Sequence, residues 1–232
     1  MPLPGPLKNL FRGIRGPAGP NGPGPTPPSN ARSAARGGEG IVSTRPSRGL
    51  EEFFSYIRDQ SGLTILDLGG ATQQNVSFIT NLGHRLYSED FLQILQETFD
   101  EGAADQSNTG RIDYFLRQAL EYPEAHFDGV LIWDVLEHLA PALLTAVIER
   151  LHTIVRPKSY MLAFFHSDDK LDAAPYYTFR IQDVNLLQVA QHGTRRPAQL
   201  FNNRSLEKLF GRYESVKFFL TRERLREVII KV

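Results

Sequence analysis

The spacing of apolar residues from residue 49 onward predicts alternating helices and strands. A helical period of apolar residues ends at Gly62, and the apolar run 63–68 that follows it is typical of a buried strand. The same reasoning predicts further strands at 85–88, 127–133 and 160–166 and helices at 75–82, 91–99, 141–155 and 205–210. Residues 114–120 fit either a strand or a helix, whereas 215–221 and 226–232 alternate as a closing hairpin does. The pattern favours a mostly parallel α/β sheet with an antiparallel edge.

The first 47 residues do not share this pattern. Ten of the 15 prolines lie in residues 1–48, and glycine and proline together predict no regular structure there. We therefore expect a disordered tail over 1–47 and one domain over 48–232, with a segment of few clear periods at 167–200. Within the tail, apolar residues at helical spacing among basic ones in 7–15 predict weak peripheral membrane contact or targeting, or else a solvated stretch without a role.

Charge and composition exclude several classes of protein. The formal net charge of zero combines +6 in residues 1–48 with −6 in the remainder, and an acidic body of this kind is not typical of a nucleic-acid-binding protein. No apolar run is long enough for an integral membrane span. The absence of cysteine rules out thiolate chemistry and fits a reducing compartment, so we expect a cytoplasmic protein.

The turn after residue 68 is the strongest local signal of a binding site. Gly69, Gly70 and Ala71 open a helix with small side chains, which lets backbone amides approach a ligand. Asp67 lies inside the apolar run, so its carboxylate needs turn amides or a ligand amine as partners. Glu89 or Asp90, at the end of the next predicted strand, suits ribose hydroxyls, although two solvated acids explain the same residues equally well.

Three motifs in residues 49–232 resemble the class I S-adenosylmethionine-dependent methyltransferases that act on small molecules. They are the strand and turn from Ile65 to Gly69, Asp90 at the family's spacing from Asp67, and the segment 127–139, which is similar to the family's FDxVxxxxVLEHL. The resemblance implies a Rossmann-like, doubly wound, mostly parallel seven-stranded sheet with an antiparallel C-terminal hairpin. It also implies S-adenosylmethionine as the cofactor.

The resemblance assigns roles to particular residues. The methionine part of the cofactor would lie against Asp67, Gly69, Gly70 and Ala71, and the ribose against Asp90, with Glu89 in reserve. Gln118 would offer an amide to the adenine, and Trp133 and Asp134 would face the cofactor cleft. The sequence departs from the family at Ala71 and Gln73, where the family has its second and third turn glycines.

Two functions are consistent with these residues. The first is methyl transfer to a small-molecule acceptor, and the alternative is a catalytically inactive methyltransferase-fold protein that serves as a binding or scaffold protein. The sulfonium donor is already activated, so a base is needed only if the acceptor loses a proton. Candidates are His138 and His166, with Asp134 as a possible orienting group, although both histidines can also be purely structural.

The segment 167–200 is expected to lie on the substrate side. Its aromatic residues Tyr176, Tyr177 and Phe179 could wall a pocket for the acceptor beside Arg180, or simply pack the segment onto the sheet. We expect no metal site, because the spacing of His166, Asp168, Asp169 and Asp172 matches no ligand motif. The sequence does not indicate an oligomeric state.

Overall fold

A computed structural model describes residues 41–99, 106–168, 170–221 and 225–232. These residues belong to one compact unit, Gly38–Val232. The proline-rich part of the expected tail, residues 1–40, lies outside the described residues, as does Asp169. Among the described residues, no helix has both the length and the apolar character needed to cross a membrane.

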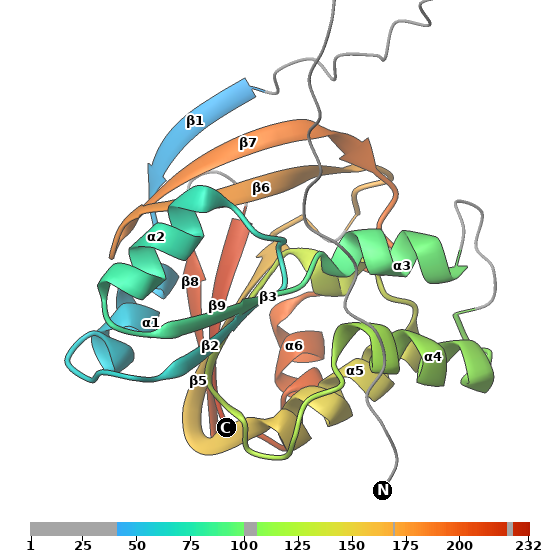
Figure 1. Cartoon of the computed structure of the whole chain (residues 1–232). Helices are drawn as coiled ribbons and strands as arrows, with labels where there is room; N and C mark the ends of the chain where they lie inside the picture. The colour runs from blue at the N-terminus through green and yellow to red at the C-terminus, as the bar shows by residue number, and fades with distance from the viewer. Residues whose placement is uncertain (1–40, 100–105, 169, 222–224) are drawn as a thin grey trace, which may run out of the picture. The chain divides into compact units, whose positions relative to one another are not determined.

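The main sheet has six strands in the order β3-β2-β4-β5-β9-β8 (Figure 1). Its parallel strands are β2 (Thr64–Asp67), β3 (Arg85–Ser88), β4 (Phe127–Trp133) and β5 (Val155–His166). The hairpin of β8 (Ser215–Leu220) and β9 (Leu225–Lys231) adds antiparallel strands beside β5. The expected fold class, with its parallel strands and antiparallel C-terminal hairpin, is confirmed.

Helices cover both faces of this sheet, as Figure 1 shows. On one side lie α1 (Arg48–Ile57) and α2 (Gln73–Asn81); on the other lie α3 (Phe91–Phe99), α4 (Thr109–Ala119), α5 (Pro141–Ile154) and α6 (Asn203–Leu209). Neighbouring residues of β4 separate into two buried clusters: Val130 and Ile132 pack with α5, and Leu131 and Trp133 pack with α1. Because strand side chains alternate between faces, this separation explains why the parallel strands are apolar throughout.

The main sheet has six described strands rather than the seven that we expected. The ambiguous segment 114–120 lies mostly in α4, which Asn108 caps by accepting a hydrogen bond from the Arg111 amide at 3.1 Å. Ile112, Phe115 and Ala119 form the buried face of that helix. Helical spacing of the buried residues therefore prevails over the strand interpretation of this segment.

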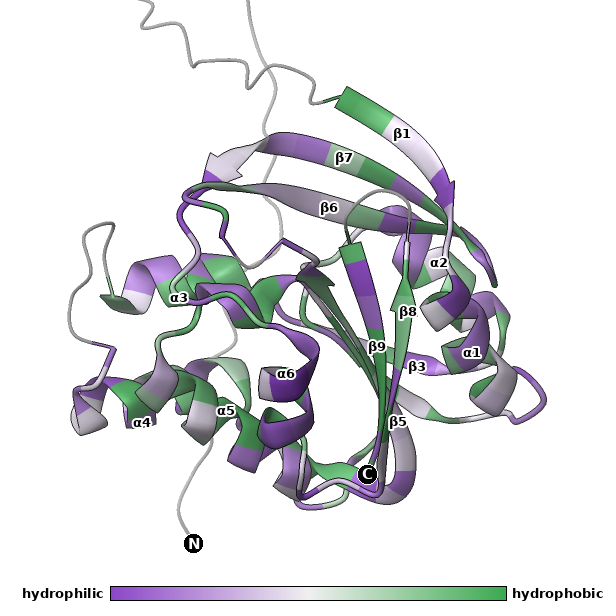
Figure 2. Ribbon diagram, turned by 180° about the vertical axis from the view of Figure 1, so that it is seen from behind, coloured by the Kyte–Doolittle hydropathy of each residue, from purple (hydrophilic) through white to green (hydrophobic). Residues whose placement is uncertain are grey.

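A second sheet has the order β1-β7-β6 and is antiparallel throughout. Its strands are β1 (Ile41–Pro46), β6 (Ala174–Asp183) and β7 (Leu186–Arg195). Figure 2 shows both hydrophobic and hydrophilic residues along β7, where Leu187 and Val189 are buried and Gln188 between them is half-buried, as expected of a sheet with one covered face. One expectation is corrected here, because β1 belongs to this sheet and the folded domain thus begins before residue 48. The segment 167–200, for which the sequence predicted no particular element, is largely a β-hairpin.

Candidate functional site

Asp90, between β3 and α3, lies against the glycines of the turn that joins β2 to α2. Gly70 has φ +81°, a conformation that favours glycine, and its amide donates to the Glu89 carbonyl at 3.0 Å. Gly69 forms an isolated antiparallel bridge with Asp90. Asp90 is exposed and accepts a hydrogen bond from the Gln93 amide at 3.1 Å, so its carboxylate caps the start of α3. Ala71, also exposed, is the last residue of the turn before Thr72 caps α2.

Asp67 is fully buried and receives three hydrogen bonds from the protein. Its donors are the Gly69 amide at 2.9 Å, the Trp133 indole Nε1 at 2.6 Å and the Asn75 amide group at 3.0 Å. Burial raises the pKa of Asp67, and these three bonds oppose the rise. The expected turn amide is therefore one partner, and two side chains of the protein supply the other two hydrogen bonds.

The indole of Trp133 lies directly against the turn. A Cβ placed on Gly69 would approach Trp133 Cδ1 to 2.6 Å, so no side chain fits between them. The indole stacks on Phe179 of β6, with ring centroids 5.1 Å apart and planes 8° apart. Trp133 is 1% exposed and has φ +59°, which is an uncommon conformation for a bulky residue. The packing around the indole thus holds a strained backbone in place.

Asn75 forms hydrogen bonds both with β6 and with Asp67 beside the turn. Its amide nitrogen donates to the Phe179 carbonyl at 3.1 Å as well as to Asp67, and its oxygen accepts from the Ile181 amide at 2.8 Å. All three bonds are buried, so breaking any of them leaves a polar group without water. The second sheet is therefore hydrogen-bonded to the residues that the resemblance assigns to the cofactor.

Among the described residues, the cavity found at the turn is small. It measures about 30 Å³ and is bounded by Gly69, Asp90, Trp133 and Asp134 together with Leu68, Leu92, Val135, Tyr177 and Phe179. Such a volume holds about two water molecules, whereas pockets for drug-sized ligands measure about 300–1,000 Å³. The described residues around the turn therefore leave no room for S-adenosylmethionine in this arrangement.

Two of the residues that we expected to contact the cofactor, Glu89 and Gln118, do not line this cavity. Glu89 is hydrogen-bonded to the phenol of Tyr122, and Gln118 is exposed on α4. Burial and the neighbouring carboxylate of Glu89 raise the pKa of Tyr122. Asp90, and not Glu89, is therefore the acidic residue at the turn.

A buried acid–base cluster lies beyond Trp133, at the C-terminal ends of β4 and β5. Glu137 Oε2 pairs with His166 Nδ1 at 2.6 Å, and its Oε1 accepts from the His166 amide at 3.0 Å. Within the described residues, His166 Nε2 and Asp134 Oδ2 are buried without a hydrogen-bond partner. His166 and Asp134, expected from the sequence, do come together, and Glu137 is the member that the sequence reasoning missed.

Burial and the contact between Glu137 and His166 together shift the pKa values of this cluster. It raises the pKa of Asp134 to about 7, with the charges of His166 and Glu137 acting in opposite directions. Burial acts to lower the pKa of His166, but the hydrogen bond and charge of Glu137 outweigh it and raise the pKa. His138 differs, because burial and the positive charges of Arg195 and His166 lower its pKa to about 4. His138 is thus neutral at physiological pH, and the cluster can exchange a proton near pH 7.

The aromatic residues of β6 have different surroundings. Phe179 packs on Trp133, whereas Tyr176 lies under the Arg195 guanidinium, 4.7 Å from ring centroid to Cζ. Tyr177 lies beside His166, with ring centroids 6.2 Å apart. For Phe179 and Tyr176, packing of the segment explains the contacts.

Comparison with known proteins identifies one family. A family model described as a methyltransferase domain matches residues 40–214, about three quarters of the chain. No curated protein sequence matches.

Solved structures share low identity with this chain. A 1,6-didemethyltoxoflavin-N1-methyltransferase from Burkholderia thailandensis, with bound 1,6-didemethyltoxoflavin and S-adenosylhomocysteine, is 15% identical over 79% of this chain and 76% of its own, with a TM-score of 0.43. A SAM-dependent methyltransferase from Archaeoglobus fulgidus is 16% identical over 79% of this chain and 92% of its own, with a TM-score of 0.45. These likenesses do not bear on the ligand or the substrate of this chain.

Proposed function

This chain belongs to the methyltransferase domain family, whose general chemistry is methyl transfer, and we propose that it is a non-catalytic, ligand- or partner-binding member. In this proposal, the region that holds the methyl donor in the family is part of the protein's own core. The fold is retained and the donor site is not.

The Trp133 indole is the observation that carries this proposal. It contacts Gly69 directly, donates to Asp67 and stacks on Phe179, which leaves a cavity of about 30 Å³. Opening the site would break the bond to Asp67 and expose a side chain that is now 1% exposed. Uncovering a large aromatic residue and leaving a buried carboxylate short of a donor costs several kcal/mol, about 3–6 in total. A donor would have to supply that free energy on binding.

One observation favours a second candidate, S-adenosylmethionine-dependent methyl transfer to a small-molecule acceptor. Asp90 is exposed and lies beside Gly70, where a Cβ would be 3.5 Å from the carboxylate carbon. A carboxylate so placed suits ribose hydroxyls. In this candidate, Asp90 and the turn would hold the cofactor, and His166 with Asp134 would take up any proton from the acceptor, after Trp133 and Phe179 had moved away.

Calorimetric titration of the full chain with S-adenosylmethionine and S-adenosylhomocysteine separates the two candidates. We expect no saturable heat up to about 1 mM of either ligand, because the free energy needed to open the site, several kcal/mol, weakens binding by orders of magnitude. Asp90→Ala is the matched variant. Saturable binding by the natural chain that is lost in Asp90→Ala, with the same far-UV circular dichroism, would overturn the proposal in favour of the second candidate.

A further inference from the structure

A second cavity lies under the second sheet. It measures about 210 Å³, and its walls come from β1, β6, β7 and β9. Tyr177 borders both this cavity and the small one at the turn, so it separates the two. The larger cavity is thus a different place from the one that the family resemblance assigns to the cofactor.

The pairing of β1 with β7 explains which side chains face this cavity. Ile41 lies opposite Gln191 and Ser43 opposite Val189, and alternate residues of a strand point to the same face. These four line the cavity together with Arg45, Tyr177 and Leu225. Ser43 is exposed and Gln191 half-buried, whereas Val189 and Leu225 are buried. The opening of the cavity therefore includes the exposed Ile41 and Ser43, and its interior includes the buried Val189, Leu225 and Arg45.

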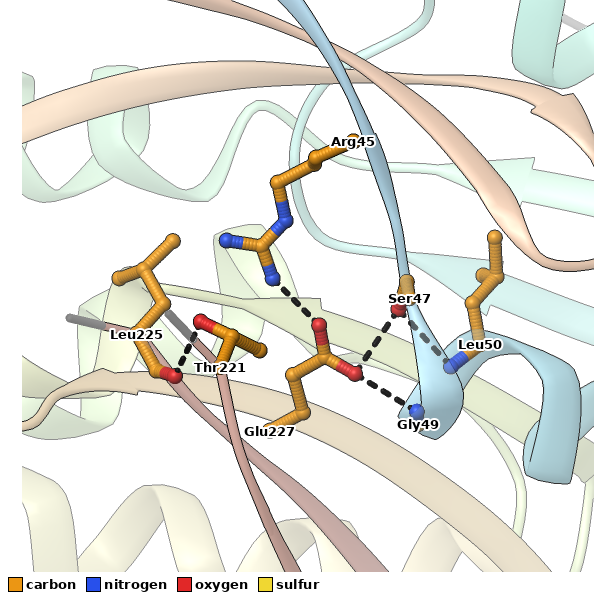
Figure 3. Close-up of polar contacts among 7 residues, drawn as sticks. All are labelled: Arg45, Ser47, Gly49, Leu50, Thr221, Leu225 and Glu227. Atoms are coloured by element: carbon orange, nitrogen blue, oxygen red, sulfur yellow. Dashed lines mark hydrogen bonds and ion pairs between the residues drawn. The ribbon is translucent and has the colours of Figure 1, made fainter. Parts of the chain in front are cut away.

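Among the described residues that line the cavity, Arg45 is the only charged one. Its side chain is 2% exposed and reaches down to Glu227 of β9, with which it forms an ion pair (Figure 3). The Glu227 carboxylate also accepts hydrogen bonds from the Ser47 hydroxyl at 3.0 Å and the Gly49 amide at 2.6 Å, at the start of α1. Glu227 of β9 therefore neutralises the charge of Arg45.

This arrangement determines the ligand chemistry. A charged ligand would be desolvated beside a guanidinium whose charge is already neutralised, which is costly. An uncharged ligand escapes that cost, can bury its apolar part against Val189 and Leu225, and can form hydrogen bonds with the hydroxyl and amide groups at the rim. The volume is below that of a pocket for a drug-sized molecule, so the ligand must be compact.

We propose that the cavity between the second sheet and β9 binds a compact, uncharged molecule that has an apolar body and one carbonyl or hydroxyl group. The site is built by β1 and by the 167–200 hairpin. The inference goes beyond the proposed function and does not depend on it, since binding here does not require the cavity at the turn to open.

Benzamide and benzoate make a matched pair of probes, because they have nearly the same size and shape and differ in charge. We expect ligand-detected saturation-transfer NMR and calorimetry on the full chain to show saturable binding of benzamide and at least tenfold weaker binding of benzoate. No S-adenosylmethionine is added, so the result is independent of the test of the methyl-donor site. Absence of benzamide binding up to about 10 mM, or equal binding of the two probes, would overturn the proposal.

Two variants of β7 test the location. Gln191→Trp fills the cavity, whereas Gln188→Trp places the same side chain on the opposite face of the strand, where Gln188 pairs with Thr44. We expect at least a tenfold loss of benzamide affinity in the first and none in the second. Ser43→Tyr, at an exposed position on the rim, replaces Gln191→Trp if that variant fails to fold. An equal affinity in all of the folded variants would place the probe elsewhere and refute the site.

Discussion

Replacing Trp133 with alanine tests whether its indole is a structural part of the core. The change removes a side chain that is 1% exposed, the 2.6 Å hydrogen bond to Asp67 and the stack on Phe179. Truncating a buried tryptophan costs about 3–5 kcal/mol, and a buried acceptor that loses a donor adds about 1 kcal/mol or more. We expect the free energy of unfolding to fall by about 4–6 kcal/mol, measured by urea denaturation followed by far-UV circular dichroism.

A comparison with Trp133→Gly isolates the backbone strain. At φ +59°, alanine keeps a left-handed penalty of about 1–2 kcal/mol that glycine does not have. Glycine otherwise costs about 0.5–1 kcal/mol relative to alanine in a strand, so Trp133→Gly should be the more stable of the two by about 0.5 kcal/mol. The same pair of substitutions at Ile132, which is fully buried in β4, should show the opposite order. A loss below about 1 kcal/mol in Trp133→Ala, or the same order at both positions, would refute this reasoning.

Three further predictions concern buried polar groups. The pKa of Asp134 in the folded state, about 7, is above its ordinary 3.8, so the free energy of unfolding should fall by up to about 4 kcal/mol from pH 4 to 7, as measured by denaturation at each pH. Asp134→Asn should remove this pH dependence. A pH profile that is the same in the variant as in the natural chain would contradict the raised pKa. Glu227→Gln leaves the buried Arg45 without its counter-charge and should cost about 3–5 kcal/mol by urea denaturation, whereas a loss under about 1 kcal/mol would contradict the buried pair. Asn75→Ala removes the tie to β6, so amide hydrogen exchange should accelerate in β6 and not in β9; equal acceleration in both strands would refute a local role.

Local patterns in the sequence predicted the main sheet well. The run 63–68 with its glycine turn, the strand 127–133 and the closing hairpin depend on neighbours within each segment, and all three lie where they were expected. The second sheet contains one strand that the sequence could have predicted and one that it could not. Tyr177, Phe179 and Ile181 alternate in β6, which is a strand signal. In contrast, β1 has no apolar alternation, and its buried Arg45 depends on Glu227, 182 residues away, so no local pattern predicts this strand.

In the candidate site, too, local patterns do not predict contacts between residues that are far apart in the sequence. Asp67 was expected to need partners, but the identity of one of them depends on β4 lying beside β2, which brings Trp133 from 66 positions away. A tryptophan at the end of the strand beside the expected cofactor cleft is the signal from which this contact could be predicted. The sequence does not single out Glu137 beside His138, because only the fold brings its partner His166, 29 residues away, within hydrogen-bonding distance.

Trp133 is the only tryptophan in the chain, so intrinsic fluorescence reports directly on the central claim that its indole fills the methyl-donor site. The decisive measurement is the emission spectrum and acrylamide quenching of the native protein while S-adenosylhomocysteine is added. We expect a blue-shifted emission with little quenching that stays unchanged up to about 1 mM ligand. A saturable red shift with increased quenching, at constant far-UV circular dichroism, would show that the ligand displaces the indole and that the methyl-donor site is open to it.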